Sequence, residues 1–196
     1  MIHDVKSEIV ATAARLVVEE GLEYGSAKRR AVRELGLPSK TALPDNHDLE
    51  EEIFHYLALF CADTQPAQLR ALRLLALGWM ERLQDFRPHL SGAVWRGSAT
   101  RLSDIYIQLF CDDPKSTELF LIDQGIRYEV QAVRGFRGEE VDALSIHSRC
   151  PELNEEIGVH LLIYDYDDLR GALQPDERGL AVRGDIAALR KLLDNG

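Results

Sequence analysis

The spacing of apolar residues changes near residue 90 of the chain. Before that point they recur every three or four positions, as Leu49, Ile53 and Leu57 do, and this spacing is typical of amphipathic helices. After it, apolar and polar residues alternate over short segments, which is typical of strands. The pattern predicts a helical region over residues 1–90 and an α/β domain over residues 91–196, and so an α+β fold.

Turn and helix-breaking residues divide these two regions into elements. In the first region the predicted helices end at Gly21, at Gly36 and before Pro88, because glycine and proline stop helices. In the second region the predicted strands are residues 93–95, 104–111, 128–133, 141–148 and 157–164. The predicted helices there are residues 117–124, 167–173 and 185–193.

Composition narrows the classes of function. Hydrophobic residues make up 45% of the 196 residues, a fraction typical of a folded protein, and the net charge is −10. A negative chain is a poor general ligand for nucleic acid, because phosphate contacts depend on clustered lysine and arginine. We interpret the one basic cluster in the first half, residues 28–33, as a solvated helix face. A helix-turn-helix that binds nucleic acid is the alternative.

Several other classes of site lack the residues that they need. No apolar run is long enough to span a membrane, and the first eight residues carry acids where a signal peptide is basic and then apolar. We therefore expect a cytoplasmic protein without a membrane partner. His147, Cys150 and His160 lack zinc-ligand spacing, so we expect core or surface histidines. The chain has no G-x-x-x-x-G-K-[ST], which excludes P-loop chemistry such as that of a muramate–alanine ligase.

The segment from Gly97 to Gln108 carries the most specific signal. From Ile105 to Cys111 every odd position is apolar, which predicts a strand with one buried face. Asp104, Tyr106 and Gln108 then point away from the core. Upstream, Gly97 and Ser98 form a predicted turn whose backbone amides could meet a phosphate.

These residues resemble the signature of the DNA polymerase beta-type nucleotidyltransferase superfamily. In that family a Gly-Ser turn supports a triphosphate, and acids on neighbouring strands hold Mg²⁺. The resemblance covers about residues 93–133 and implies a small mixed sheet with flanking helices. It implies that Asp104 is a catalytic metal ligand and that Glu129 is a second metal ligand. It further implies that Gly97 and Ser98 bind the phosphates of a nucleotide.

The resemblance also has consequences for the arginines and for Tyr106. Arg96 or Arg101 would stabilise the developing phosphate charge during transfer of a nucleoside monophosphate from an NTP. Tyr106, however, occupies the position of the second acid, and a neutral phenol is a poor Mg²⁺ ligand. The sequence therefore predicts either a transferase or a fold that binds a nucleotide without transfer.

Other interpretations of the same residues stay open. Asp104 could simply end a strand, and Glu129 could be a solvated acid on an outward face. The whole protein could be a regulatory or interaction module that forms a homodimer through its helical half. A regulator that binds nucleic acid through the basic helix is a third hypothesis.

Overall fold

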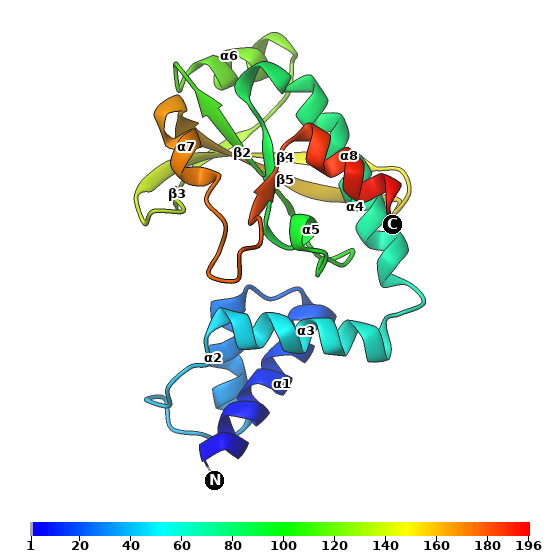
Figure 1. The fold of residues 1–196 in the computed structure, drawn as a ribbon, viewed down its shortest axis with the longest axis vertical. Helices are drawn as coiled ribbons and strands as arrows, with labels where there is room; N and C mark the ends of the chain where they lie inside the picture. Colours follow the sequence, from blue (N-terminus) through cyan, green and yellow to red (C-terminus); the bar gives the residue numbers. More distant parts are fainter. Residues whose placement is uncertain (1) are drawn as a thin grey trace. The chain divides into compact units, whose positions relative to one another are not determined.

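The computed structural model describes residues 2–196, with side chains from residue 5 onward, and the chain forms two compact units (Figure 1). The first unit is Met1–Pro66 and the second is Ala67–Gly196. An α+β fold is thus confirmed. The units divide after Pro66 and not near residue 90, because the fourth helix packs on the sheet instead of on the other helices. No helix within residues 2–196 is both long enough and apolar enough to cross a membrane.

The first unit consists of three helices around a small core. They are α1 (Ile2–Glu20), α2 (Tyr24–Glu34) and α3 (Asn46–Phe60). The helices predicted at these places are confirmed, and α3 begins at Asn46 because the Asp45 side chain caps it by accepting from the Asp48 amide. Ile9, Ala13, Leu16, Leu49 and Ile53 are fully buried between the helices.

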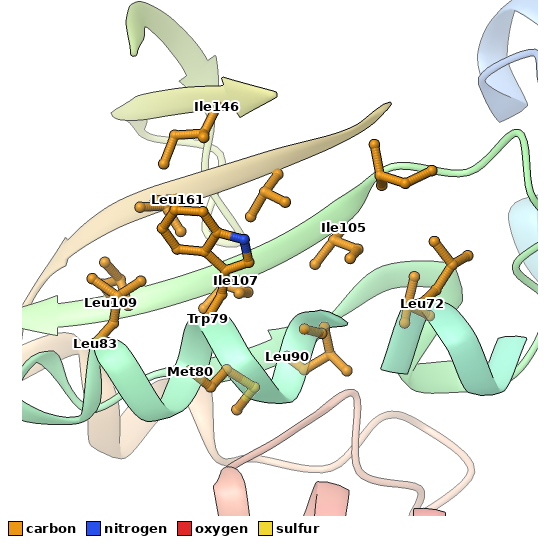
Figure 2. Packing of buried hydrophobic residues seen from close by; sticks show 14 of the residues in the cluster. Leu72, Trp79, Met80, Leu83, Leu90, Ile105, Ile107, Leu109, Ile146 and Leu161 are labelled. Carbon is orange, nitrogen blue, oxygen red and sulfur yellow. The ribbon is translucent and has the colours of Figure 1, made fainter. Parts of the chain in front are cut away.

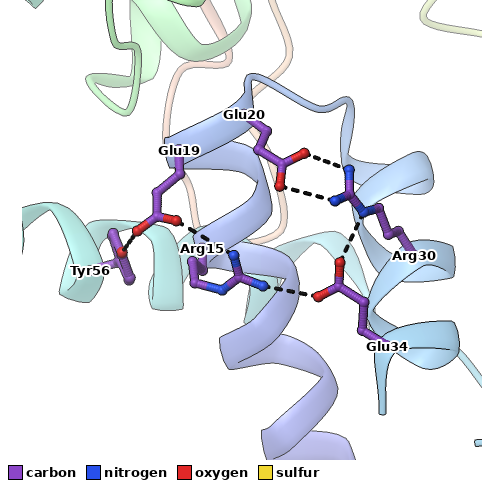
Figure 3. A network of polar contacts seen from close by, with 6 residues as sticks. All are labelled: Arg15, Glu19, Glu20, Arg30, Glu34 and Tyr56. Atoms are coloured by element: carbon purple, nitrogen blue, oxygen red, sulfur yellow. Dashed lines mark hydrogen bonds and ion pairs between the residues drawn. The ribbon is translucent and has the colours of Figure 1, made fainter. Parts of the chain in front are cut away.

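The basic cluster on α2 is largely engaged within the first unit. Lys28 is buried, and its Nζ donates to the Pro44 carbonyl at 2.9 Å and to Asn46 Oδ1 at 2.8 Å. Arg30 binds Glu20 and Glu34, which joins α1 to α2 (Figure 3). The cluster is therefore not a uniformly solvated face, since Lys28 ties α2 to the segment before α3.

The second unit is a mixed six-stranded sheet with helices packed on it. Its strands are β1 (His89–Ser91), β2 (Ile105–Cys111), β3 (Glu129–Arg134), β4 (Glu140–Cys150), β5 (Glu155–Asp165) and β6 (Arg183–Gly184). Its helices are α4 (Gln65–Arg82), α5 (Gly92–Arg96), α6 (Ser116–Asp123), α7 (Leu169–Ala172) and α8 (Ile186–Asp194), with short 3₁₀ turns at Gln84–Phe86 and Tyr166–Asp168. The strand order is β3-β4-β5-β2-β1-β6, and only the β2–β5 pair is parallel.

The core of the second unit lies on one face of this sheet. Ile105, Ile107 and Leu109 of β2 are fully buried there, as their alternation predicted. Leu72 and Met80 of α4 pack beneath them (Figure 2). Two polar contacts join α4 to α8. Arg70 Nη1 of α4 donates to the Leu193 carbonyl of α8 at 2.8 Å, and Arg190 of α8 pairs with Glu81 of α4. Each buried leucine or isoleucine contributes about 1.5–3 kcal/mol of burial free energy.

One predicted strand is wrong. Residues 93–95 form helix α5 and not a strand. Gly92 begins this short helix and Gly97 follows its last residue, with φ values of +71° and +100°, conformations that turn the chain sharply at both ends. The apolar Ala93-Val94-Trp95 run is therefore a single helical turn that buries Val94 in the core.

Replacement of Lys28 by methionine should destabilise the first unit. The variant removes the only buried amine of α2 and leaves the Pro44 carbonyl without that donor, which costs about 1–3 kcal/mol. Urea unfolding followed by circular dichroism measures the loss, and Arg29→Met, one residue along on an exposed arginine, is the matched control. Equal midpoints for the two variants would contradict a structural role for Lys28.

Tyr56 of α3 should make the helical unit sensitive to alkaline pH. Its hydroxyl donates to Glu19 of α1, which raises the pKa of Tyr56 to about 12 from its usual value near 10. The stabilisation is present below pH 10 and is lost as the pH rises through about 12, because the phenolate cannot donate. We expect the difference in urea midpoint between the wild type and Tyr56→Phe to shrink over this interval. A difference that is constant from pH 9 to 12 would contradict this assignment.

Candidate functional site

The face of the sheet opposite the α4 core is partly covered and partly polar. At the end where β2 and β5 finish, Phe110, Tyr164 and Ala172 form a second small core, and Phe136 packs against it. The start of β2 carries Asp104 and Tyr106 on the same face. Strand alternation thus gives this face an apolar end and a polar end.

A row of directly opposed residues crosses the polar end of the sheet. Neighbouring members of the row are register partners on adjacent strands, so their side chains share one face. In order from β3 to β6 the row is Glu129, Ser145, His160, Tyr106, Ser91 and Arg183. Hydroxyl, imidazole, phenol and guanidinium groups therefore stand side by side on one surface.

Asp104, His160 and Ser145 form a continuous chain of hydrogen bonds within this surface. His160 Nε2 lies 2.8 Å from Asp104 Oδ2, and His160 Nδ1 lies 2.8 Å from Ser145 Oγ. The Tyr106 ring stacks on the imidazole with centroids 4.8 Å apart. The His160 side chain is 22% exposed and that of Asp104 is 46% exposed, so both groups remain within reach of a ligand.

The contact with Asp104 determines which nitrogen of the His160 imidazole carries the proton. An ionised carboxylate can only accept a hydrogen bond, so the proton of a neutral His160 lies on Nε2. Nδ1 then carries the lone pair and accepts from the Ser145 hydroxyl. The arrangement aims a basic nitrogen at a hydroxyl group.

Gly158 is the residue that lets Asp104 approach the strand. A Cβ at this position would lie 2.7 Å from Asp104 Cγ and 2.8 Å from both carboxylate oxygens. The carboxylate thus occupies the space of a missing side chain directly beside His160, two residues along β5. A glycine is needed here for close approach and not for an unusual backbone angle.

Arg183 supplies a half-buried positive charge at the other end of the row. Its Nε donates to Gln108 Oε1 at 2.5 Å, and its guanidinium lies 5.0 Å from the centre of the Phe136 ring. Burial lowers the pKa of Arg183, and the neighbouring charge of Arg96 lowers it further. Among the residues with described side chains, no carboxylate forms an ion pair with it. Such a cation is suited to a ligand with negative charge.

The Gly-Ser turn is used differently from the sequence prediction. The amides of Gly97 and Ser98 both donate to the Ala93 carbonyl, at 2.9 and 3.1 Å, and so end helix α5. They are therefore not available as the predicted phosphate donors. Ser98 is buried, and its Oγ has no hydrogen-bond partner within the described part of the chain.

The other predicted site residues lie apart from one another. Arg101 pairs with Glu155 at the start of β5, whereas the charge of Arg96 acts on Arg183 and lowers its pKa. Glu129 and Asp104 are on opposite sides of the Ser145–His160 pair, because β4 and β5 separate β3 from β2. At about 4.8 Å per strand spacing, three spacings place them roughly 14 Å apart along the sheet.

The oxygen ligands expected for Mg²⁺ do not converge. Among residues 5–196, no group of three or more His, Cys, Asp or Glu side chains is placed to hold a metal ion. Asp104 has an imidazole and not a second carboxylate beside it. Paired metal ions require several carboxylate oxygens around a shared position, so the residues present do not fit a two-metal centre.

Sequence reasoning did not identify His160, Ser145 or Arg183 as site residues. The alternation of Gly158, His160 and Leu162 with buried apolar residues on β5 indicates that His160 leaves the core. Its partners depend on the β4–β5 and β2–β5 registers, which a single sequence does not give. Comparison with known proteins adds no candidate: no protein-family model matches the chain, and no curated protein matches its sequence.

Replacement of Gly158 by alanine should displace Asp104 without unfolding the sheet. The added methyl group would lie 2.7 Å from the carboxylate carbon, and the exposed Asp104 side chain can rotate away into solvent. We expect loss of the His160–Asp104 hydrogen bond, seen as a changed Nε2 signal in ¹⁵N-edited NMR of the imidazoles, with a melting temperature close to that of the wild type. An unchanged imidazole spectrum would contradict this close approach.

Proposed function

We propose that the second unit binds a nucleotide on the polar face of its sheet. The observation that carries the proposal is Arg183, a half-buried guanidinium that Gln108 orients and that no described carboxylate neutralises. Arginine binds phosphate oxygens through paired, charge-assisted hydrogen bonds. The positive charge of Arg96 acts on Arg183 and lowers its pKa, so in the proposal both arginines contribute to binding a polyphosphate.

The distance along β2 between the carboxylate and the residue that orients Arg183 is comparable with the length of a nucleotide. Asp104 and Gln108 are four residues apart, which corresponds to roughly 13 Å at about 3.3 Å per residue, and Gln108 is itself buried, so the ligand would meet the guanidinium of Arg183 and not Gln108. The phosphates would lie at the Arg183 end, where Gln108 holds the guanidinium. Asp104 keeps acceptor capacity beside His160, and a ribose hydroxyl is a donor of the kind that a carboxylate binds.

The nucleotidyltransferase resemblance implies either transfer of a nucleotide or binding of a nucleotide without transfer, and the site favours the second. Two-metal transfer needs carboxylates on a shared strand face, and Tyr106 stacks on His160 at the second of these positions. The amides of Gly97 and Ser98 donate to the Ala93 carbonyl, so in the proposal Arg183 and Arg96 replace them as phosphate ligands. A resident metal ion has no part in it.

Nucleotide binding should raise the melting temperature through Arg183. A ligand of the folded state at a hundred times its Kd adds about 2.7 kcal/mol, which is a shift of several degrees. We expect ATP, GTP, CTP or UTP to produce such a shift in a thermal-shift assay with or without Mg²⁺, and Arg183→Gln to abolish it.

Arg190→Gln is the matched control for this experiment. Arg190 is an arginine of α8 that pairs with Glu81 on the helical side of the sheet, so its loss should leave the shift unchanged. A shift that survives in Arg183→Gln would contradict the proposed phosphate ligand. A shift that requires Mg²⁺ and disappears in Asp104→Ala would favour a metal-dependent nucleotide site instead.

A further inference from the structure

Ser145 combines two features that none of the functions above uses. Its hydroxyl is hydrogen-bonded to His160 Nδ1 at 2.8 Å, and the same residue lines a groove of about 870 Å³. The groove lies on the β3 side of β4, away from Arg183 at the far edge of the sheet. A hydroxyl of a groove-lining residue that contacts a basic nitrogen is the arrangement of an activated nucleophile.

The groove begins where the pairing of β3 with β4 stops. The last register pair of these strands is Glu129 with Ser145, whereas β5 continues to pair with β4 as far as Cys150. From Ile146 to Cys150 the β3 side of β4 is thus a strand edge. Alternate backbone amides point toward that edge and can donate to a ligand.

From these contacts we propose that Ser145, His160 and Asp104 form a nucleophilic acyl-transfer site that acts on carboxylic esters in this groove. Ser145 is the nucleophile and His160 the general base. Asp104 acts through His160 by accepting from Nε2–H, and it is a positioning residue. The proposal does not depend on nucleotide binding.

The reaction proceeds in two balanced steps. Ser145 Oγ attacks the ester carbonyl carbon while its proton passes to His160 Nδ1. The tetrahedral intermediate then expels the alcohol oxygen, which takes that proton, and an acyl-serine remains. Water repeats the sequence with His160 as base, which releases the carboxylic acid and restores the serine hydroxyl. In the proposal, an amide of the β4 edge donates to the intermediate's negative oxygen and stabilises it.

The charges of the groove indicate the class of ester. Arg82, Arg127 and Arg149 line it, and the guanidinium of Arg82 lies over the Trp79 ring at 4.5 Å. Glu129 and Glu156 line the groove as well, so the arginines are in excess there although the chain carries a net charge of −10. An ester whose acyl group carries a free carboxylate fits this surplus of positive charge.

Covalent labelling tests the nucleophile directly. We expect a fluorophosphonate probe to modify the full-length protein, with the adduct located on Ser145 by peptide mass spectrometry. Ser145→Ala should abolish the labelling, and His160→Gln should slow it by at least a hundred-fold, because general-base assistance contributes about 10²–10⁴-fold. Circular dichroism melting of both variants establishes that they are folded.

Ser148→Ala is the matched control. Ser148 lies on the same strand and lines the same groove, but its hydroxyl accepts from Trp79 Nε1 instead of contacting an imidazole, so its replacement should leave labelling unchanged. Absence of an adduct on Ser145 in the folded wild-type protein would overturn the proposal. Labelling of Ser145 at the same rate in folded His160→Gln would overturn it as well.

Steady-state hydrolysis tests the roles of Asp104 and of the arginines. We expect 4-nitrophenyl hemisuccinate to be cleaved with a lower KM than 4-nitrophenyl acetate, and Arg127→Gln to remove that difference. Asp104→Asn should lower kcat by about a hundred-fold or more with KM unchanged, since it leaves the groove intact. Equal KM values for the two esters, or an unchanged kcat in Asp104→Asn, would overturn these assignments. The hydrolysis assay contains no nucleotide, so this test and the nucleotide test fail independently.

Discussion

The packing of β2 against α4 is the constraint on which the rest of the second unit depends. Ile105, Ile107 and Leu109 are fully buried against that helix, and a slip of one residue would move all three to the opposite face. With this face fixed, Tyr106 and Gln108 must stand on the other side of the sheet. The strand registers then place His160 and Ser145 on the same side, because His160 of β5 lies opposite Tyr106 of β2 and Ser145 of β4 lies opposite His160.

The opposite face is stable because its apolar and polar groups are separated along the strands. Phe110 and Tyr164 stack at one end, where Phe136 and α7 cover them. Arg183 lies at the border of this cover, and its contacts with Gln108 and Phe136 offset part of the cost of its burial. The polar end stays uncovered by apolar side chains, so imidazole, carboxylate and hydroxyl groups can meet there without losing all contact with water.

The sequence predicted the elements better than the site. Alternation identified β2 and its buried face, and the glycine stop at Gly21 identified the end of α1, because both signals are local. Ala93-Val94-Trp95 is predicted as a strand, since three apolar residues show no period, and the positive φ values of Gly92 and Gly97, which turn the chain at the two ends of this helical turn, are a property of the folded chain. The Asp104–His160–Ser145 chain joins residues up to 56 positions apart, and only the strand registers bring them together.

The structure changes which part of the nucleotidyltransferase resemblance bears on function. The Gly-Ser turn and the two acids were one functional unit in the sequence argument, but here the turn amides end α5 and Glu129 stands beyond Ser145. Asp104 contacts the neighbouring strand β5, where its hydrogen-bond partner is the imidazole of His160. An imidazole next to one carboxylate moves a proton more readily than it recruits Mg²⁺, whose preferred ligands are oxygens. This pairing is why proton-transfer chemistry at Ser145 and metal-independent binding at Arg183 are better supported by the geometry than two-metal transfer.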